Sequence, residues 1–197
     1  MEAINLKVVI ASNNKYKIKE FKEMLKNYEV FSQEEIGFFD DVKETGTTFL
    51  ENALIKARAI NKYLKDNNIE AMVIADDSGL CVDALNGAPG VYSARYAGNH
   101  DNKANREKLI KELSDKTNRD AHYECSLVKM NYDGTYKVYT GQTYGRILDH
   151  EEGDDEFGFN KIFYSNDLKK TFASSSIEER NEVSHRGRAM KLLLKDI

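Results

Sequence analysis

The stretch Ala71-Met72-Val73-Ile74-Ala75-Asp76-Asp77-Ser78-Gly79-Leu80 gives the strongest indication of fold in this chain. Its first five residues are an unbroken apolar run, which is typical of a buried strand. The two aspartates that follow predict the end of that strand, and the small residues after them predict a turn. Open α/β proteins bind ligands and metals at the carboxyl end of such a strand.

The adjacent carboxylates of Asp76 and Asp77 are costly to place together unless a cation or a proton accompanies them. Because neighbouring residues of a strand point to opposite faces, only one of the two is expected to face any given site. That carboxylate could bind Mg²⁺, activate an attacking water, or do both. The alternative is an Asx-type turn without chemistry.

Strand and helix patterns interleave on both sides of this stretch, which predicts an α/β fold with a mixed β-sheet and helices on its faces. Strands are expected at 6–11, 28–31, 72–75, 122–130, 135–144 and 161–164, and helices at 15–26, 48–66, 101–113 and 184–194. The helix from Thr48 is the clearest, because it combines an apolar stripe with a capping-box pattern between Thr48 and Glu51. Residues 131–134 are typical of a hairpin turn. No linker marks a boundary, so residues 1–197 are expected to form one domain.

Composition excludes some classes of protein. The chain has 197 residues and a net charge of −4, which argues against a nucleic-acid-binding protein with a general basic excess. No stretch approaches the roughly 20 apolar residues that a membrane span needs, and residues 1–10 show no signal segment. Cys81 and Cys125 lack metal-type spacing and are expected to be reduced, semi-buried residues. We therefore expect a soluble cytoplasmic protein.

The first predicted loop, Ser12-Asn13-Asn14-Lys15-Tyr16-Lys17, leads from a buried strand into a helix. Free backbone amides at a helix N-terminus attract anions, while lysines in the first turn oppose the helix dipole. Lys15 and Lys17 would therefore gain from a bound phosphate, although the glycine pattern of a P-loop is missing. The alternative is an ordinary Ser/Asn cap with solvated lysines.

Several charged residues have structural interpretations of their own. Lys56 lies off the apolar stripe of its helix, so periodicity favours a surface lysine. The capping box explains Glu51. Glu44 lies in a loop and gains interest only as a second metal ligand beside Asp77. The acidic run 151–156 is interpreted as a solvated loop, because consecutive like charges repel and no calcium-loop spacing is present.

Two further segments could recognise a planar base. In Phe157-Gly158-Phe159-Asn160, a glycine between aromatic rings lets a base approach the backbone and stack. The alternative is a pair of core aromatics flanking a bend. Ser184-His185-Arg186-Gly187-Arg188 opens the last helix with Ser184 as its cap. Cationic groups at the positive end of a helix dipole indicate an anionic or keto-bearing ligand, although His185 alone would more often be a surface residue.

Six segments of this chain, taken in order, resemble the Ham1/inosine triphosphate pyrophosphatase family. They are ASNNKYK at 11–17, TGTTFLENA at 45–53 with Lys56-Ala57, ADDSGL at 75–80, GAPGVYSARY at 87–96, FGF at 157–159 and SHR at 184–186. They span nearly the whole chain, and six such motifs in the family's order are highly specific. The resemblance implies an elongated mixed α/β fold with two lobes around a central cleft.

The resemblance also implies an activity, the Mg²⁺-dependent hydrolysis of ITP, dITP and XTP to the monophosphate and pyrophosphate by a homodimer. By matching position, Lys17 and Lys56 would be catalytic residues that act on the triphosphate. Glu44 and Asp77 would hold the metal, and Asp77 would also be the general base. The substrate-binding residues implied in the same way are Ser12, Asn13, Asn14, Lys15, Tyr16, Lys17, Ser78, Phe157, Gly158, Phe159, Asn160, Arg180, His185 and Arg186.

These roles agree with the chemistry of phosphoryl transfer. A metal ion and lysines neutralise charge on the phosphates while a carboxylate orients water on the α-phosphorus. Donors from His185 and Arg186 would satisfy the keto oxygen of a 6-keto purine and would face a 6-amino group badly.

The chain departs from the family pattern at two places. The family usually continues Phe-Gly with Tyr or Trp, then Asp and Pro, where this chain has Phe159-Asn160-Lys161. It also usually has Lys where Arg180 stands. These differences bear on base preference more than on phosphate chemistry.

Three hypotheses follow. The first is a house-cleaning hydrolase that removes deaminated purine nucleotides from the precursor pool. The second is a nucleotide-binding sensor with little turnover. The third is a related pyrophosphatase whose base preference is altered by Asn160 and Lys161.

Overall fold

The computed structural model describes residues 6–98 and 100–197, which divide into two compact units. The first unit contains the chain up to Asp77 together with Ser126–Tyr139 and Leu192–Ile197, and the second contains Ser78–Cys125 and Thr140–Lys191. The expectation that residues 1–197 form one domain stays a prediction.

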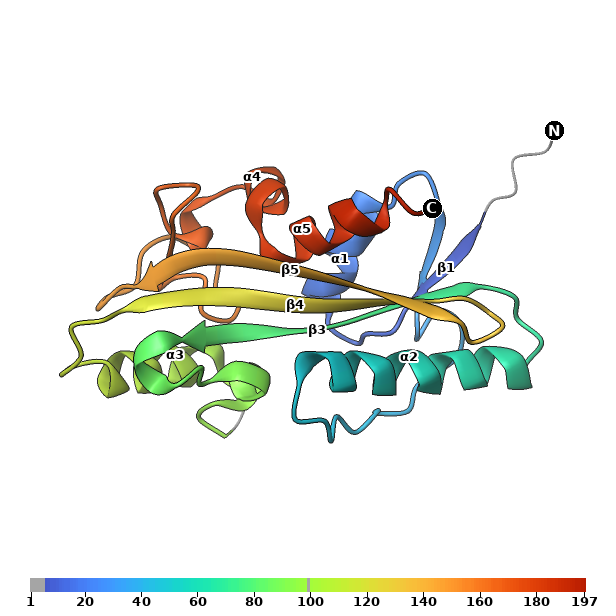
Figure 1. Cartoon of the computed structure of the whole chain (residues 1–197), viewed down its shortest axis with the longest axis horizontal. Coiled ribbons are helices and arrows are strands. Elements are labelled where there is room, and N and C mark those ends of the chain that lie inside the picture. Colours follow the sequence, from blue (N-terminus) through green and yellow to red (C-terminus); the bar gives the residue numbers. More distant parts are fainter. Residues whose placement is uncertain (1–5, 99) are drawn as a thin grey trace. The chain divides into compact units, whose positions relative to one another are not determined.

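A six-stranded sheet provides the framework, as Figure 1 shows. Its strand order is β2 (Glu29–Ser32), β1 (Lys7–Ile10), β3 (Met72–Val82), β4 (Asp120–Met130), β5 (Tyr136–Ile147) and β6 (Phe163–Ser165). The pairings of β1 with β2 and β3 are parallel, whereas β5 and β6 are antiparallel. The prediction of a mixed sheet with helices on its faces is therefore confirmed.

In the first unit, two helices cover the sheet: α1 (Lys15–Met24) and α2 (Phe49–Asp66), which lie on opposite sides of β3 in Figure 1. The apolar stripe of α2 packs against alternate residues of β3. The resulting core contains Ala53, Ala57, Ile60 and Leu64 of α2 with Val9, Val73, Ala75, Val128 and Met130 of the strands. Burial of these side chains fixes which face of β3 each residue occupies.

Local sequence signals set the ends of both helices. Asn14 caps α1 by accepting hydrogen bonds from the backbone N–H groups of Tyr16 and Lys17. The predicted capping box of α2 is confirmed, since Thr48 accepts from the N–H of Glu51 and the Glu51 carboxylate accepts from the N–H of Thr48.

The second unit contains α3 (Asn102–Glu112), α4 (Ile177–Val183) and α5 (His185–Leu193) as far as Lys191, and its core is built on α3 and the strands. Three short 3-10 helices lie at Asp83–Leu85, Gly90–Arg95 and Phe172–Ser174. The core contains Leu80, Val82, Leu109, Leu113, Tyr123, Ile147, Phe159, Ile162, Phe163 and Phe172. Helix α4 was not predicted, although its capping box between Ser176 and Glu179 is readable in the sequence.

The main correction concerns β3. The strand does not end at Ala75 in a small-residue turn, and no Asx turn forms there; it runs on for eleven residues, from Met72 to Val82. The backbone stays extended because both aspartates find partners on the two faces of the strand, which offsets the cost of burying them. The sixth strand is also shifted, from the predicted 161–164 to Phe163–Ser165.

The predicted hairpin is confirmed. β4 and β5 are neighbours in the sheet, and the N–H of Asn131 donates to the carbonyl of Thr135 at 2.8 Å in the turn between them. Within the described residues, no helix combines the length and apolar character that crossing a membrane requires. Cys81 and Cys125 are both free thiols, as expected.

Candidate active site

Two adjacent residues of β3 present their carboxylates to different helices. Asp76 accepts a hydrogen bond at 3.0 Å from the Nζ of Lys17 on α1, and Asp77 accepts one at 2.9 Å from the Nδ2 of Asn52 on α2. Asp76 is 1% exposed and Asp77 is 7% exposed. The alternation of side chains along the strand therefore separates the two carboxylates, as the sequence predicts.

Lys56 joins Glu44 to this strand. Its Nζ lies 2.7 Å from a carboxylate oxygen of Glu44 and donates to the backbone carbonyl of Asp76 at 2.7 Å. The side chain of Lys56 is only 11% exposed, so the interpretation of Lys56 as a surface lysine is wrong. Periodicity could not reveal this, because the carboxylates that draw the lysine inward come from other segments.

Burial and the neighbouring charges shift the pKa values of Asp77 and Lys56. Desolvation raises the pKa of Asp77 and Glu44 adds to the effect, while Lys56, Lys17 and the hydrogen bond from Asn52 oppose it. Burial alone would lower the pKa of Lys56, but the surrounding carboxylates outweigh burial and raise it. A carboxylate of raised pKa beside two ammonium groups is suited to accept a proton from water.

Asn52 connects the two acidic residues of the cluster, although the sequence did not single it out. It is fully buried, and its Oδ1 accepts a 2.8 Å hydrogen bond from the N–H of Gly46, two residues after Glu44. A Cβ at Gly46 would lie 2.7 Å from that oxygen, so the close approach requires glycine. The four-residue spacing of Asn52 and Lys56 places both on one face of α2 and is the signal that could have identified Asn52.

Glu44 and Asp77 are the residues of this cluster that could hold a divalent cation. Carboxylate oxygens are the donors that Mg²⁺ prefers, and one or two of them suffice when phosphates and waters supply the rest. Glu44 lies close enough to raise the pKa of Asp77. No group of three or more His, Cys, Asp or Glu side chains in residues 6–98 and 100–197 has the arrangement of a metal site. Two carboxylates, those of Glu44 and Asp77, fit a cation that takes its remaining ligands from substrate phosphates and waters.

The loop before α1 has more internal bonding than an open anion site. The side chain of Asn14 already accepts from the N–H groups of Tyr16 and Lys17, and Ser12 Oγ accepts from the N–H of Asn14 at 3.1 Å. These hydrogen bonds confirm a Ser/Asn cap at the start of the helix, as the alternative interpretation of this loop expected. Asn13 and Lys15 are exposed at the same end of the helix.

In the second unit, the predicted base-recognition residues of α5 are buried. The guanidinium of Arg186 donates to Ser78 Oγ at 3.1 Å. The ring of His185 stacks on Tyr123, with 4.8 Å between centroids and 11° between planes. His185 is 8% exposed, so it is not a surface residue. Ser184 accepts from the N–H of Gly187 at 3.0 Å and caps α5 as predicted.

The acidic segment 151–156 is not simply a solvated loop. Arg106, which is 1% exposed, binds Glu151 at 2.6 Å and Glu156 at 2.7 Å. Asp155 accepts from Arg180 at 2.7 Å and from Asn160 at 3.1 Å. The solvated-loop interpretation is incomplete: most of the segment is exposed, but Glu151, Asp155 and Glu156 pair with Arg106 of α3, Arg180 of α4 and the nearby Lys161.

The Ham1 family model matches residues 8–196 of this chain. The chain belongs to the Ham1 family. A protein of Clostridium perfringens named dITP/XTP pyrophosphatase is 46% identical over 95% of both chains. Two solved structures are also similar: the Staphylococcus aureus Ham1 protein, at 45% identity and TM-score 0.84 over 96% of this chain and 97% of that one, and a HAM1 protein from Coxiella burnetii, at 36% identity and TM-score 0.85 over 98% and 100%.

Membership of the Ham1 family confirms the resemblance inferred from the six motifs, and the two structures confirm the fold class. The predicted residues fall into two sets. The first unit brings together Lys17, Glu44, Lys56 and Asp77. The second holds Ser78 with Arg186, and Asn160 with Arg180 on either side of Asp155.

The two aromatic rings of the Phe-Gly-Phe motif differ in burial. Phe159 is 2% exposed and belongs to the hydrophobic core, as the core interpretation expected, whereas Phe157 is half-buried. Gly158 between them has φ +53°, a left-handed conformation that favours glycine. Of the two rings, Phe157 is the one with surface available for stacking on a base.

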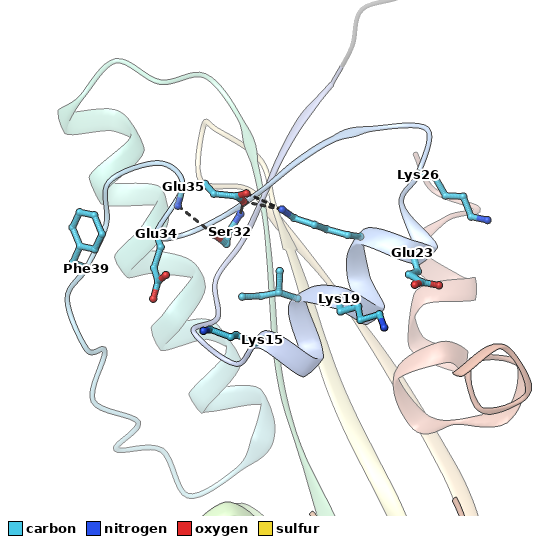
Figure 2. A pocket seen from close by; sticks show the side chains of 10 residues that line it. Lys15, Lys19, Glu23, Lys26, Ser32, Glu34, Glu35 and Phe39 are labelled. Atoms are coloured by element: carbon cyan, nitrogen blue, oxygen red, sulfur yellow. Dashed lines mark hydrogen bonds and ion pairs between the residues drawn. The ribbon is translucent and has the colours of Figure 1, made fainter. Parts of the chain in front are cut away.

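A groove on the first unit, of about 980 Å³, lies between α1 and the segment after β2 (Figure 2). Figure 2 shows Lys15, Lys19 and Lys26 on its α1 side, and Glu34 and Glu35 on the other. Glu35 pairs with Lys22 at 2.9 Å across it. Of the lining residues only Lys15 is among the predicted site residues, and the charges of the walls are mixed. We assign no ligand to this groove.

Proposed function

We propose that this chain is a nucleoside triphosphate pyrophosphatase that hydrolyses dITP, ITP and XTP to the monophosphate and pyrophosphate. Its relatives in the Ham1 family, named dITP/XTP pyrophosphatases, support this substrate class at up to 46% identity over most of the chain. The activity would remove deaminated purine nucleotides from the precursor pool.

The observation that carries the proposal is the buried carboxylate of Asp77 beside Lys17, Lys56 and Glu44. Asp77 is the general base: it accepts a proton from the water that attacks the α-phosphorus, and its raised pKa favours that transfer. Lys17 and Lys56 offset the negative charge of the triphosphate as pyrophosphate departs. Asn52 keeps the Asp77 carboxylate oriented through its hydrogen bond.

Glu44 and Asp77 would hold Mg²⁺, together with phosphate oxygens of the substrate. When bound, the ion would neutralise phosphate charge and lower the pKa of a coordinated water. Ser12, Asn13, Asn14, Lys15 and Tyr16 would contact the phosphates from the loop before α1, where Asn13 and Lys15 are exposed beside the capped N-terminus of the helix.

Base recognition is assigned to the second unit. Arg186 and His185 would provide donors to a 6-keto oxygen, and Ser78 would support Arg186 through the hydrogen bond already described. A 6-amino group would place donor against donor, so adenine nucleotides are rejected. Phe157 would stack on the base, with Gly158 allowing close approach. Phe159 would act from behind this surface because it belongs to the hydrophobic core, and Asn160 and Arg180 because both donate to Asp155.

The decisive experiment measures Mg²⁺-dependent product release from dITP, XTP, dGTP and ATP, with pyrophosphate resolved from orthophosphate. Wild type, Asp77→Asn and a control, Asp83→Asn, would be compared, because Asp83 is an exposed aspartate just beyond the end of β3. Pyrophosphate released mainly from dITP and XTP, lost in Asp77→Asn and kept in Asp83→Asn, is the expected result.

Other outcomes separate the alternatives. Orthophosphate would indicate a different hydrolase. Equal use of dGTP would indicate an altered base preference through Asn160 and Lys161. Tight nucleotide binding without turnover would indicate a sensor.

We also propose that the enzyme is a cytoplasmic homodimer, as the resemblance of its six motifs implies. Light scattering on the purified chain would test the dimer directly.

A further inference from the structure

Arg106 of α3 is an almost completely buried cation whose donors all point at one segment. Its Nε donates to Glu151 at 2.6 Å, and one terminal nitrogen donates to the Glu156 carboxylate at 2.7 Å. The other terminal nitrogen donates to the backbone carbonyls of Glu156 and Gly158, at 3.1 Å each. Arg106 therefore binds the backbone carbonyls of the residues immediately before and after Phe157.

A guanidinium at 1% exposure is costly to bury unless its hydrogen bonds are made. Its carboxylate partners do not share that burial, since the side chains of Glu151 and Glu156 are 33% and 66% exposed. The planar fork of arginine can reach two carboxylates and two carbonyls at once, which an ammonium group cannot do. The geometry is therefore specific to arginine and to this segment.

The same segment is held on its inner side by Asp155. The carboxylate of Asp155 accepts from the N–H of Phe157 at 2.9 Å. It also accepts from Asn160 and Arg180, two of the positions at which this chain departs from the family pattern. Lys161, another of these positions, pairs with Glu151 and Glu156. The three polar or charged departures, Asn160, Lys161 and Arg180, thus belong to the network of ion pairs and hydrogen bonds around Phe157 and Gly158, whereas Phe159 lies in the hydrophobic core.

We propose that Arg106 is a positioning residue for base recognition, which fixes the Phe157–Gly158 segment so that the ring of Phe157 is preorganised to stack on the base. This inference rests on the proposed function. Arg106 acts through the backbone carbonyls that it holds and does not touch the substrate. Its loss therefore weakens binding of the base and leaves binding of the triphosphate intact, because the phosphate-binding residues belong to the first unit.

The test compares Arg106→Gln and Arg106→Lys with a matched control, Arg119→Lys. Arg119 also holds three backbone carbonyls, those of Leu113, Ile147 and Leu148, but none in the segment 151–160. Four quantities are measured: kcat and KM for dITP, and the inhibition constants of inosine monophosphate and of inorganic tripolyphosphate. Thermal melts report on folding.

For both Arg106 variants, KM for dITP and the inhibition constant of inosine monophosphate should rise at least about fivefold, with a smaller change in kcat. The inhibition constant of tripolyphosphate should stay within about twofold of wild type. Arg119→Lys should leave the ratio of the two inhibition constants unchanged. If Arg106→Gln does not fold, Glu156→Gln removes one partner at the surface and should change the same ratio in the same direction.

Folded variants in which both inhibitors weaken equally, or in which neither weakens, would overturn the role of Arg106 while leaving the proposed function intact. A wild type that neither hydrolyses dITP nor binds inosine monophosphate would overturn both.

Discussion

The buried side-chain amide of Asn52 donates a hydrogen bond of 2.9 Å to the carboxylate of Asp77. The same amide accepts from the N–H of Gly46, in the loop that carries Glu44. One side chain thus orients the proposed general base and anchors the segment of the second proposed metal ligand. Supporting residues of this kind set the geometry of a metal-dependent site without entering it.

Replacing Asn52 by alanine should lower kcat by about 10- to 100-fold, because Asp77 and the Glu44 loop lose their shared anchor. Binding of Mn²⁺, followed by paramagnetic resonance as a probe of the cation site, should weaken in parallel. Asn61→Ala is the matched control, since Asn61 is a buried asparagine of the same helix whose side-chain amide donates to the carbonyls of Asn131 and Tyr132, away from Asp77 and Gly46. Equal effects of the two substitutions on Mn²⁺ binding would contradict the role of Asn52.

The pH dependence of activity should reflect the raised pKa of Asp77. The general base must be ionised, and burial raises the pKa of Asp77 in the metal-free protein, so at subsaturating Mg²⁺ kcat/KM should fall on the acidic side at a pH above the ordinary range of an aspartate. The hydrogen bond from Asn52 favours the ionised form, so its removal in Asn52→Ala should raise the pKa of Asp77 further and move the acidic limb to higher pH. A pH–rate profile of both proteins measures the shift. An acidic limb that stays in place or moves to lower pH would count against Asp77 as the base.

Asp77→Asn should abolish turnover and yet stabilise the fold. A carboxylate whose pKa is raised in the folded state ionises more readily in the unfolded state, so it lowers stability at pH values above its folded pKa. The neutral amide removes this cost, and melting at about pH 8 should occur roughly 2–4 °C higher than in wild type. The difference should shrink as pH falls toward the pKa of Asp77. A lower melting temperature at about pH 8 would show that the carboxylate stabilises the fold.

Lys17→Met should lower both stability and activity, because it removes the ammonium partner of the buried Asp76 carboxylate. Breaking such a pair costs about 3–5 kcal/mol, and the pair here has a 3.0 Å contact with 14% and 1% exposure. In the double variant Lys17→Met with Asp76→Asn, stability should recover, but KM for dITP should remain high because the phosphate still lacks its cation. Melting curves and steady-state kinetics separate the two effects, with Lys19→Met as an exposed lysine control on the same helix. Recovery of KM in the double variant would assign Lys17 a structural role only.

The presence of Asn160 has a structural explanation that can be tested by exchange. The family usually has Asp at the position of Asn160. In this chain the Nδ2 of Asn160 donates to the carboxylate of Asp155, so Asp155 supplies a carboxylate next to position 160. Asn160→Asp would set two carboxylates against each other and should lower the melting temperature. Adding Asp155→Asn should restore much of the loss, which is the non-additivity expected of residues in contact. Asp154→Asn, at an exposed neighbour, should give no such rescue.

Local sequence patterns predicted most of the elements. The caps at Asn14 and Thr48, the stripe of α2 and the turn at 131–134 each depend on residues a few positions apart, and each is present in the structure. The same kind of signal exists for α4, in its capping box, and the prediction missed it. The continuation of β3 through Asp76 and Asp77 had no local signal, because an isolated pair of aspartates favours a turn.

The sequence by itself determined that the chain belongs to a mixed α/β class, that the motifs follow the order of the Ham1 family, and that Asp76 and Asp77 point to opposite faces. These follow from hydrophobic period and from the geometry of a strand, which act over a few residues. Tertiary structure alone decided the charge pairing. Asp76 meets a lysine 59 positions away, and Arg106 meets glutamates 45 and 50 positions away. Because the free energy of a buried charge is set by whichever groups the fold brings within hydrogen-bond distance, no local pattern could show which acids of this chain are buried and paired.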